Sequence, residues 1–336
     1  MLRYLQLLKF SGGGGSDSHP PDFSSPMIQE NNITEKIDRA DELIKHGQLI
    51  EAIACLQEIH ELHPNDESVV LRLAWAYWDN GNKQRSVEYW KILLDRELQR
   101  KVFTGFAYDE LVRIYKQEEQ IESLVAICEK AARVQPEDIG LLKELGTAYL
   151  LAGQSDKSCE TFKTLTSMEP DNPAFYCLLG EACLAAGKNQ EFENAYRHAG
   201  MIDPDEADRY LFQAAGLCIK KDLFKEAKEL LLNCLELSPS NSLYYCSLGD
   251  VLVATNNVPG AFAEYEKACV YNPPHAAAYL NRLGISLMRA EYFDNAVKAF
   301  ESALSFDAST PCLQHLEEAR QASGRCKKHP VETENI

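Results

Sequence analysis

The stretch LLGEACLAAGKNQEFENAYRHAGMIDPD, residues 178–205, returns in outline further along the chain. Residues 280–309 read LNRLGISLMRAEYFDNAVKAFESALSFDAS, with a glycine, several alanines and a closing aspartate at nearly the same offsets. A chain that repeats one phrase at a fixed interval builds the same structural element several times, so this self-similarity decides the fold class.

The interval is clearest at five prolines. Pro136, Pro170, Pro204, Pro239 and Pro273 are separated by 34, 34, 35 and 34 residues. Glycine or alanine precedes each of the last four by 24 positions. A period of this length indicates a solenoid, in which each repeat packs on its neighbours.

Each repeat reads as two amphipathic helices. Leu142, Leu145 and Tyr149 are spaced to share one face of a first helix. We expect first helices to end near a glycine, as at Gly81, Gly153 and Gly187, because glycine adopts the left-handed conformation that ends helices. A second helix follows, as in NAVKAFESAL at 295–304, and the periodic proline cannot continue it. Small residues, Gly249 among them, recur where the two helices of a repeat are expected to approach each other closely.

This pattern resembles the tetratricopeptide repeat, a helix–turn–helix element of 34 residues. Between 242 and 275 the family's positions are occupied by Tyr245, Leu248, Gly249, Leu252, Ala261, Tyr265, Ala268 and Pro273. The resemblance implies an all-α fold, a right-handed α-solenoid of about eight repeats with a C-terminal capping helix. We expect the repeats at 33–66, 67–100, 105–138, 139–172, 173–206, 208–241, 242–275 and 277–310.

The ends of the chain differ from the array. Residues 1–32 include SGGGGSDSHPPDFSSP and are expected to form a flexible leader. We expect a capping helix at 311–324 and a disordered tail at 325–336.

Some residues depart from the family pattern. The second repeat has Leu98 where proline belongs, and the third has Val112 and Leu124 at positions usually held by small residues. Phe192 replaces alanine in the fifth. We expect these departures to change local packing and to leave the fold intact.

Composition argues against two classes of partner. The chain has 51 acidic and 34 basic residues, a formal charge of -17, so we expect no nucleic-acid partner and no attraction to an anionic membrane. No apolar run approaches the roughly 20 residues of a membrane-spanning helix. Arg3 and Lys9 interrupt the apolar start MLRYLQLLKF, which makes it a poor signal peptide. Eleven cysteines without a C-x-x-C pair favour a reducing, cytoplasmic location.

Signals for catalysis are few. The GGGGS run lacks the Gly-Lys-Ser/Thr of a phosphate-binding loop, and His60 and His63 have no third metal ligand beside them. Glu118 and Glu119 stand at an expected turn, where charge is ordinary. No stretch of 60 residues outside the array remains for a catalytic domain. We therefore predict that the protein is not an enzyme and that it holds no cofactor or metal.

The family resemblance also implies a binding surface. In tetratricopeptide arrays, positions 2, 5, 6, 9, 12 and 13 of each repeat face a concave groove, and we call the residues at these positions the groove residues. Carried over to this sequence, the candidates are Leu71, Arg72, Trp75, Trp78, Phe106, Arg113, Lys143, Leu150, Leu178, Leu184, Arg209, Phe212, Ile219, Leu243, Asp250, Asn281, Arg282 and Arg289.

Two tryptophans leave two interpretations open. Trp75 and Trp78 are three residues apart and share one helix face. They either anchor a partner in the groove or fill the core between the second and third repeats.

A chaperone-binding clamp is not expected. Some family members bind a C-terminal carboxylate through an ordered set of lysines, asparagines and an arginine. Lys143 and Arg282 match that set, but Thr147, Leu178 and Ala278 do not.

The leading hypothesis is a scaffold or adaptor that binds a peptide or helix of another protein in the groove. The alternative is a peripheral assembly factor or chaperone of a membrane or secretion complex, tethered or autoinhibited by residues 1–10. The partner is expected to be a protein in either case.

Overall fold

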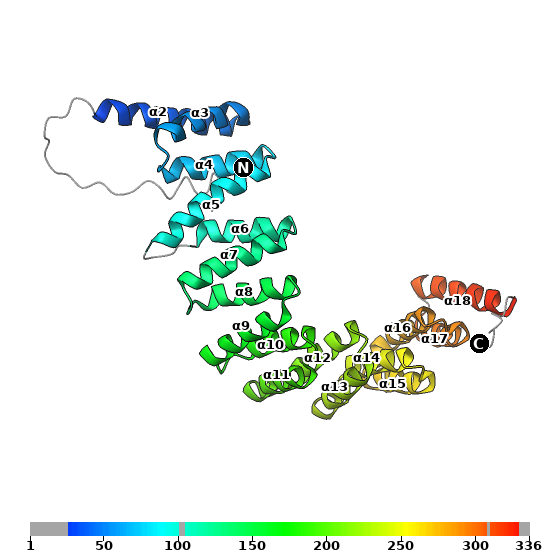
Figure 1. The fold of residues 1–336 in the computed structure, drawn as a ribbon. Helices are drawn as coiled ribbons and strands as arrows, with labels where there is room; N and C mark the ends of the chain where they lie inside the picture. Colours follow the sequence, from blue (N-terminus) through cyan, green and yellow to red (C-terminus); the bar gives the residue numbers. More distant parts are fainter. Residues whose placement is uncertain (1–25, 101–104, 308–309, 329–336) are drawn as a thin grey trace, which may run out of the picture. The chain divides into compact units, whose positions relative to one another are not determined.

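The computed structural model describes residues 26–100, 105–307 and 310–328, and within these ranges it contains helices and no strand (Figure 1). The chain divides into two compact units, Met1–Ala152 and Gly153–Ile336, called here the N-terminal and C-terminal units. The N-terminal unit contains α2 Pro26–Lys45, α3 Leu49–Leu62, α4 Glu67–Asp79, α5 Lys83–Gln99, α6 Phe106–Gln117, α7 Ile121–Val134 and α8 Ile139–Leu151.

The C-terminal unit continues the same alternation of helices and short turns. It contains α9 Ser155–Met168, α10 Pro173–Ala185, α11 Asn189–Ile202, η1 Pro204–Glu206, α12 Ala207–Lys220, α13 Phe224–Leu237, α14 Ser242–Ala254, α15 Val258–Tyr271, η2 Pro273–His275, α16 Ala276–Arg289, α17 Phe293–Phe306 and α18 Thr310–Lys328. Within each unit, every helix packs on the one before it and the one after it. This stacking of sequence neighbours confirms the α-solenoid.

The first helices begin at a polar residue two positions after the periodic proline. Asp66 accepts hydrogen bonds from the backbone N–H groups of Ser68 and Val69, at 2.8 and 3.3 Å. Asp138 and Asn241 cap α8 and α14 in the same way. Each cap satisfies a backbone donor that has no partner inside its helix.

The turn between the two helices of a repeat uses one left-handed residue. Positive φ angles recur at the fifteenth position of the expected repeats, at Gly47, Gly81, Glu119, Gly153, Gly187, Asp222, Asn256 and Glu291. Four of these residues carry a side chain, so the turn geometry belongs to the repeat and does not depend on glycine. The predicted turns at Gly81, Gly153 and Gly187 are confirmed.

Glycines inside the first helices mark close approach between paired helices. A Cβ atom on Gly249 would lie 2.6 Å from the ring of Tyr265, and one on Gly284 would lie 2.3 Å from the ring of Phe300. Because real Cβ atoms do not approach this closely, these positions require glycine beside the aromatic ring.

The departure at Val112 has a packing explanation. Its repeat carries Cys128 at the position where the aromatic rings of Tyr265 and Phe300 stand in other repeats. Both Val112 and Cys128 are buried. A larger residue on α6 is therefore matched by a smaller one on α7, and the total volume is similar.

At both ends, the helical array extends further than the sequence analysis predicts. α2 begins at Pro26, inside the expected leader 1–32, and residues 1–25 lie outside the described part of the chain. α18 continues to Lys328, beyond the expected cap 311–324 and into the expected tail, and packs on α16 and α17 through buried Cys312, Leu316 and Ala319. The individual repeat boundaries stay a prediction.

Candidate functional site

Trp75 belongs to the core of the N-terminal unit. Its side chain is only 7% exposed, and its ring meets that of Trp90 edge to face, with centroids 5.3 Å apart. Trp90 in turn contacts the ring of Phe106, with centroids 5.7 Å apart. The structure thus decides between the two interpretations for this residue, and the placement of Trp75 in the groove is wrong.

Trp78 differs from Trp75, because it remains partly exposed between two cations. The Nζ atom of Lys83 lies 5.6 Å and the guanidinium carbon of Arg113 lies 5.1 Å from its ring. Arg113 also donates to Glu110 at 2.8 Å. The indole face therefore already has cationic neighbours within the chain.

Arg72 is committed to a neighbouring helix. Its Nε and a terminal nitrogen each donate to a different oxygen of Asp41 at 2.9 Å, and another nitrogen donates to the backbone oxygen of Ser68. Both side chains of the ion pair are mostly buried. Such a two-pronged pair fixes α4 against α2.

The remaining groove residues of the N-terminal unit stay accessible to different degrees. Leu71, Phe106 and Leu150 are partly exposed, and Lys143 is exposed.

A hollow of about 350 Å³ lies between α6 and α8 in this unit. Asp109, Asp138 and Glu144 contribute carboxylates to its wall. Burial raises the pKa of Asp109, and the negative charges of Glu110 and Glu144 raise it further. Glu144 forms an ion pair with Lys116 at 2.6 Å, which places one compensating cation in the vicinity.

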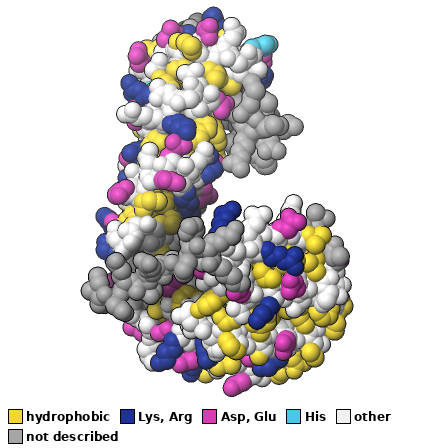
Figure 2. Space-filling view, turned by 90° about the vertical axis from the view of Figure 1, so that its right-hand side faces the viewer, with side chains coloured by type: hydrophobic (Ala, Val, Ile, Leu, Met, Phe, Trp, Pro, Cys, Tyr) yellow, Lys and Arg dark blue, Asp and Glu magenta, His cyan; other side chains and the backbone are white. Residues whose placement is uncertain are grey.

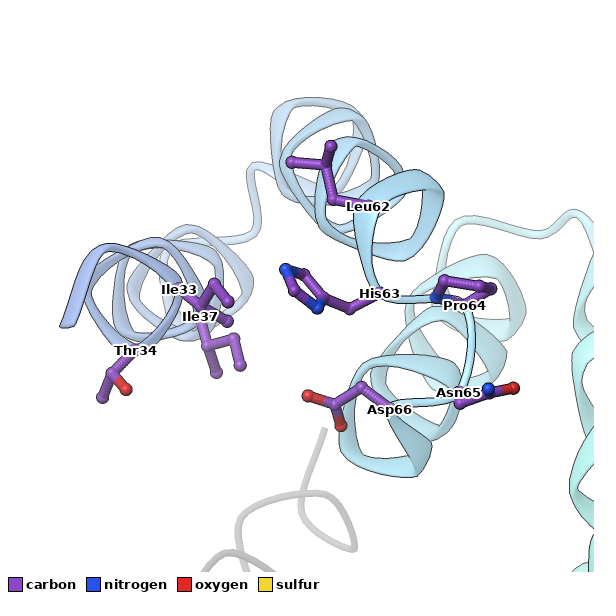
Figure 3. Close-up of a pocket in the computed structure, with 8 residues that line it drawn as sticks. All are labelled: Ile33, Thr34, Ile37, Leu62, His63, Pro64, Asn65 and Asp66. Atoms are coloured by element: carbon purple, nitrogen blue, oxygen red, sulfur yellow. The ribbon is translucent and has the colours of Figure 1, made fainter. Parts of the chain in front are cut away.

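A second hollow, of about 780 Å³, lies between α2 and the turn from α3 to α4. Figure 3 shows the His63 ring directed toward Ile37, with Leu62 on the helix end above them. Asp66, the cap of α4, forms part of the wall. Over the ranges that the structure describes, no group of three or more His, Cys, Asp or Glu side chains could hold a metal ion.

In the C-terminal unit, apolar groove residues reach the surface on three first helices. Leu178 on α10, Phe212 and Ile219 on α12 are partly exposed, and Leu243 on α14 is 50% exposed. The ring of Phe212 packs on that of Tyr244, with centroids 4.8 Å apart. Cations accompany them, since Arg209 and Arg289 are exposed.

Leu184 does not face the surface as predicted. Leu184 is buried. Cys246 and Val253 on α14 also occupy groove positions of their repeat, and they are buried as well. At these three positions the positional rule for groove residues does not identify accessible side chains.

Two further predicted residues bind each other. Arg282 donates to Asp250 at 2.6 and 2.9 Å, and Asp250 also accepts from Tyr265 and Ser286. Asn281 contacts the ring of His315 on α18 at 3.0 Å. The polar groove residues of α14 and α16 therefore hold the array together in this structure.

Sequence reasoning missed Gly216, which occupies the ninth position of its repeat on α12. A Cβ atom built there would meet nothing within 4 Å. Neither packing nor a positive φ requires this glycine. The backbone of α12 is therefore not covered by a side chain at this position, beside Phe212 and Ile219.

It also missed a set of apolar side chains at the ends of second helices. Six of the eight second helices, all except α5 and α11, end in an exposed hydrophobic side chain: Leu62, Val134, Met168, Leu237, Tyr271 and Phe306. On the face shown in Figure 2, apolar, basic and acidic side chains are interspersed. The six exposed helix-end residues are about one or two repeats apart, and this spacing could have revealed the set in the sequence.

Comparison with known proteins identifies the class to which this repeated helical architecture belongs. Models of the tetratricopeptide repeat match residues 37–99, 143–207 and 246–311, and a further one matches 208–241. These matches cover more than half of the chain, and the chain belongs to the tetratricopeptide repeat family. Members of this family generally mediate protein–protein interactions, and their repeats typically form non-enzymatic scaffolds.

Similar proteins include the TPR repeat-containing protein YvcD of Bacillus subtilis, 29% identical over 52% of this chain and 34% of that protein. The peroxisomal targeting signal receptor of Candida albicans is 22% identical over 62% of this chain and 36% of that protein. This chain thus spans about a third of the length of each relative. A tetratricopeptide repeat protein from Parabacteroides merdae, whose structure is solved, matches 86% of this chain and 99% of its own at 13% identity, with a TM-score of 0.39.

None of the helices in the described ranges combines the length and the apolar character needed to span a membrane.

Proposed function

We propose that this protein is a non-enzymatic scaffold or adaptor that binds a peptide segment or helix of another protein along the first helices of its repeats. The family's general role in protein–protein interaction supports the class. The proposed position of the binding surface, on the first helices, rests on one observation: Leu243, a groove residue on α14, keeps half of its side chain exposed.

The surroundings of Leu243 suit an apolar segment. Phe212 and Ile219 on α12 are partly exposed, and Gly216 between them leaves space for the backbone or a bulky side chain of a ligand. A partner helix that buries its apolar face here would remove this surface from water.

The chain offers a matched pair of variants for the test. Leu243 is 50% exposed on the first helix α14, and Leu237 is 55% exposed at the end of the second helix α13. Because both side chains are half exposed, Leu243→Asp and Leu237→Asp should fold equally well, which circular dichroism verifies.

The measurement is quantitative affinity capture from native lysate with the full chain and each variant. We expect a partner that the unchanged chain and Leu237→Asp retain and Leu243→Asp loses. Retention by Leu243→Asp, or equal loss in both variants, would contradict binding at the first helices. Trp75 is not a suitable target, because its replacement would disrupt the core.

The alternative role, an assembly factor tethered or autoinhibited by residues 1–10, depends on a segment outside the described residues and stays a prediction, as does the cytoplasmic location. Deleting residues 1–25 tests it. Release from a membrane fraction, or stronger capture of the same partner, would favour the alternative.

A further inference from the structure

Two cysteine side chains meet inside the C-terminal unit. The Sγ atoms of Cys159 on α9 and Cys183 on α10 lie 3.7 Å apart. Both residues are almost completely buried, with 1% and 0% of their surface exposed. Ten cysteines in the described ranges are free thiols, and among those ten this is the one pair with sulfur atoms in contact.

Ion pairs close the structure around these thiols. Lys163 on α9 contacts Glu191 on α11 at 2.6 Å, and Lys188 contacts Asp156 on α9 at 2.7 Å. An oxygen of Glu191 lies 4.0 Å from the sulfur of Cys183. The thiols are thus held together and shielded in the folded unit.

Burial in the folded unit protects the two thiols from oxidation. Burial raises the pKa of Cys183 to about 12, with smaller contributions from the hydrogen bond to Cys159 and from nearby negative charge. At neutral pH the thiol is therefore protonated, whereas the thiolate is the nucleophile. A local opening of the structure around the two thiols admits water and oxidant together, so reaction follows opening.

We propose that Cys159 and Cys183 form an oxidisable dithiol, a modification site at which a peroxide creates a disulfide between α9 and α10. In the first step, the thiolate of one cysteine attacks a peroxide oxygen, the O–O bond breaks, and a sulfenic acid forms. The hydroxide that leaves takes up the proton lost by the thiol and becomes water. In the second step, the other sulfur attacks the sulfenic sulfur, the S–S bond forms, and a second water leaves. Two thiols lose two electrons in total, and one hydrogen peroxide is reduced to two waters.

The geometry makes this pair the preferred cross-link. A disulfide has an S–S distance of about 2.05 Å, so the sulfurs of Cys159 and Cys183 must approach by roughly 1.7 Å. The bond would close a loop from α9 through the turn to α10 and restrict the unfolded chain. The oxidised protein should therefore melt several degrees above the reduced protein, and added reductant should reverse the change.

The test uses the full chain treated with hydrogen peroxide, with and without urea below the unfolding transition. Free thiols are then alkylated, and disulfide-linked peptides are identified by mass spectrometry. We expect the Cys159–Cys183 link, formed faster in urea because opening is promoted. Cys159→Ser should abolish the Cys159–Cys183 link. Cys234→Ser, which replaces a buried cysteine whose thiol donates a hydrogen bond to the backbone oxygen of Asp208, should retain the link.

The mapping on the unchanged chain does not depend on how any variant folds. If both thiols remain open to alkylation under conditions that oxidise other cysteines, the proposal is wrong. Links of Cys159 or Cys183 to other cysteines in place of each other would overturn it as well. Phenylarsine oxide, which bridges neighbouring thiols, supplies a second readout: in urea it should protect both cysteines of the unchanged chain from alkylation but not Cys183 of Cys159→Ser.

Discussion

Arg282 on α16 donates two hydrogen bonds, from Nε and a terminal nitrogen, to one carboxylate oxygen of Asp250 on α14. A similar pair links Arg72 on α4 to Asp41 on α2, where the two nitrogens donate to different oxygens of the carboxylate. In both cases a carboxylate at the ninth position of one expected repeat meets a guanidinium at the sixth position of the next. These side chains sit at groove positions, and their first role is to join consecutive first helices.

Breaking the Asp250 pair should destabilise the C-terminal unit. Arg282→Met leaves a partly buried carboxylate with only neutral donors, and because the arginine side chain is 43% exposed we expect a loss near the lower end for charged hydrogen bonds, about 1 kcal/mol. Chemical denaturation measures the change. Arg320→Met, which breaks the exposed pair with Glu301, is the control and should have little effect. Equal stability of both variants would show that the pair contributes nothing.

Glycines on the first helices should respond oppositely to the same replacement. Gly249→Ala places a methyl group 2.6 Å from the Tyr265 ring, and we expect a loss of about 1–3 kcal/mol. Gly216→Ala meets open space and should stabilise α12 by up to about 1 kcal/mol, since alanine favours helix more than glycine does. Thermal denaturation of the two variants compares them directly. A gain for Gly249→Ala would contradict the helix pairing described at Gly249, and a loss for Gly216→Ala would contradict the open surroundings of Gly216.

The left-handed turns offer stabilising changes. Glu119 and Glu291 have φ angles of 53° and 63°, a region that costs residues with a side chain about 1 kcal/mol or more. Glycine removes this cost but makes the unfolded chain more flexible, so we expect Glu291→Gly to gain about 0.5 kcal/mol. Gly187→Ala, at a φ of 73°, should lose about 1 kcal/mol. The denaturant midpoints of the two variants, measured under the same conditions, test these changes in stability. A gain for Gly187→Ala would be incompatible with the described turn.

Asp109 should make stability depend on pH in an unusual direction. Its pKa is raised in the folded state by burial and by the charges of Glu110 and Glu144. A carboxyl group whose pKa is raised by folding binds its proton more tightly in the folded state than in the unfolded state. Its ionisation therefore lowers the free energy of unfolding. This loss is absent below the unfolded pKa of about 3.9 and develops as the pH rises through the folded pKa.

Asp109→Asn should therefore raise the melting temperature at pH 7 and make no difference at pH 3. Asp171→Asn, at an exposed turn, is the control for the loss of one negative charge. A stabilisation of the same size at both pH values, or in both variants, would argue against a raised pKa at Asp109.

The sequence by itself determined the class of fold and much of its local geometry. The 34-residue period identified paired helices, and Gly81, Gly153 and Gly187 located turns correctly, because helix periodicity and left-handed turns depend on nearby residues. Gly249 was expected to lie at a close helix contact, and its measured neighbour is Tyr265.

Only the tertiary structure decided which side chains at groove positions are available. Trp75 and Trp78 share a helix face, yet one packs against Trp90 and the other remains partly exposed. A position in a repeat defines the direction of a side chain, but the neighbouring repeat determines what covers it. For the same reason the thiols of Cys159 and Cys183 looked unrelated at 24 residues apart in the chain, and packing of α9 on α10 brought their sulfur atoms together.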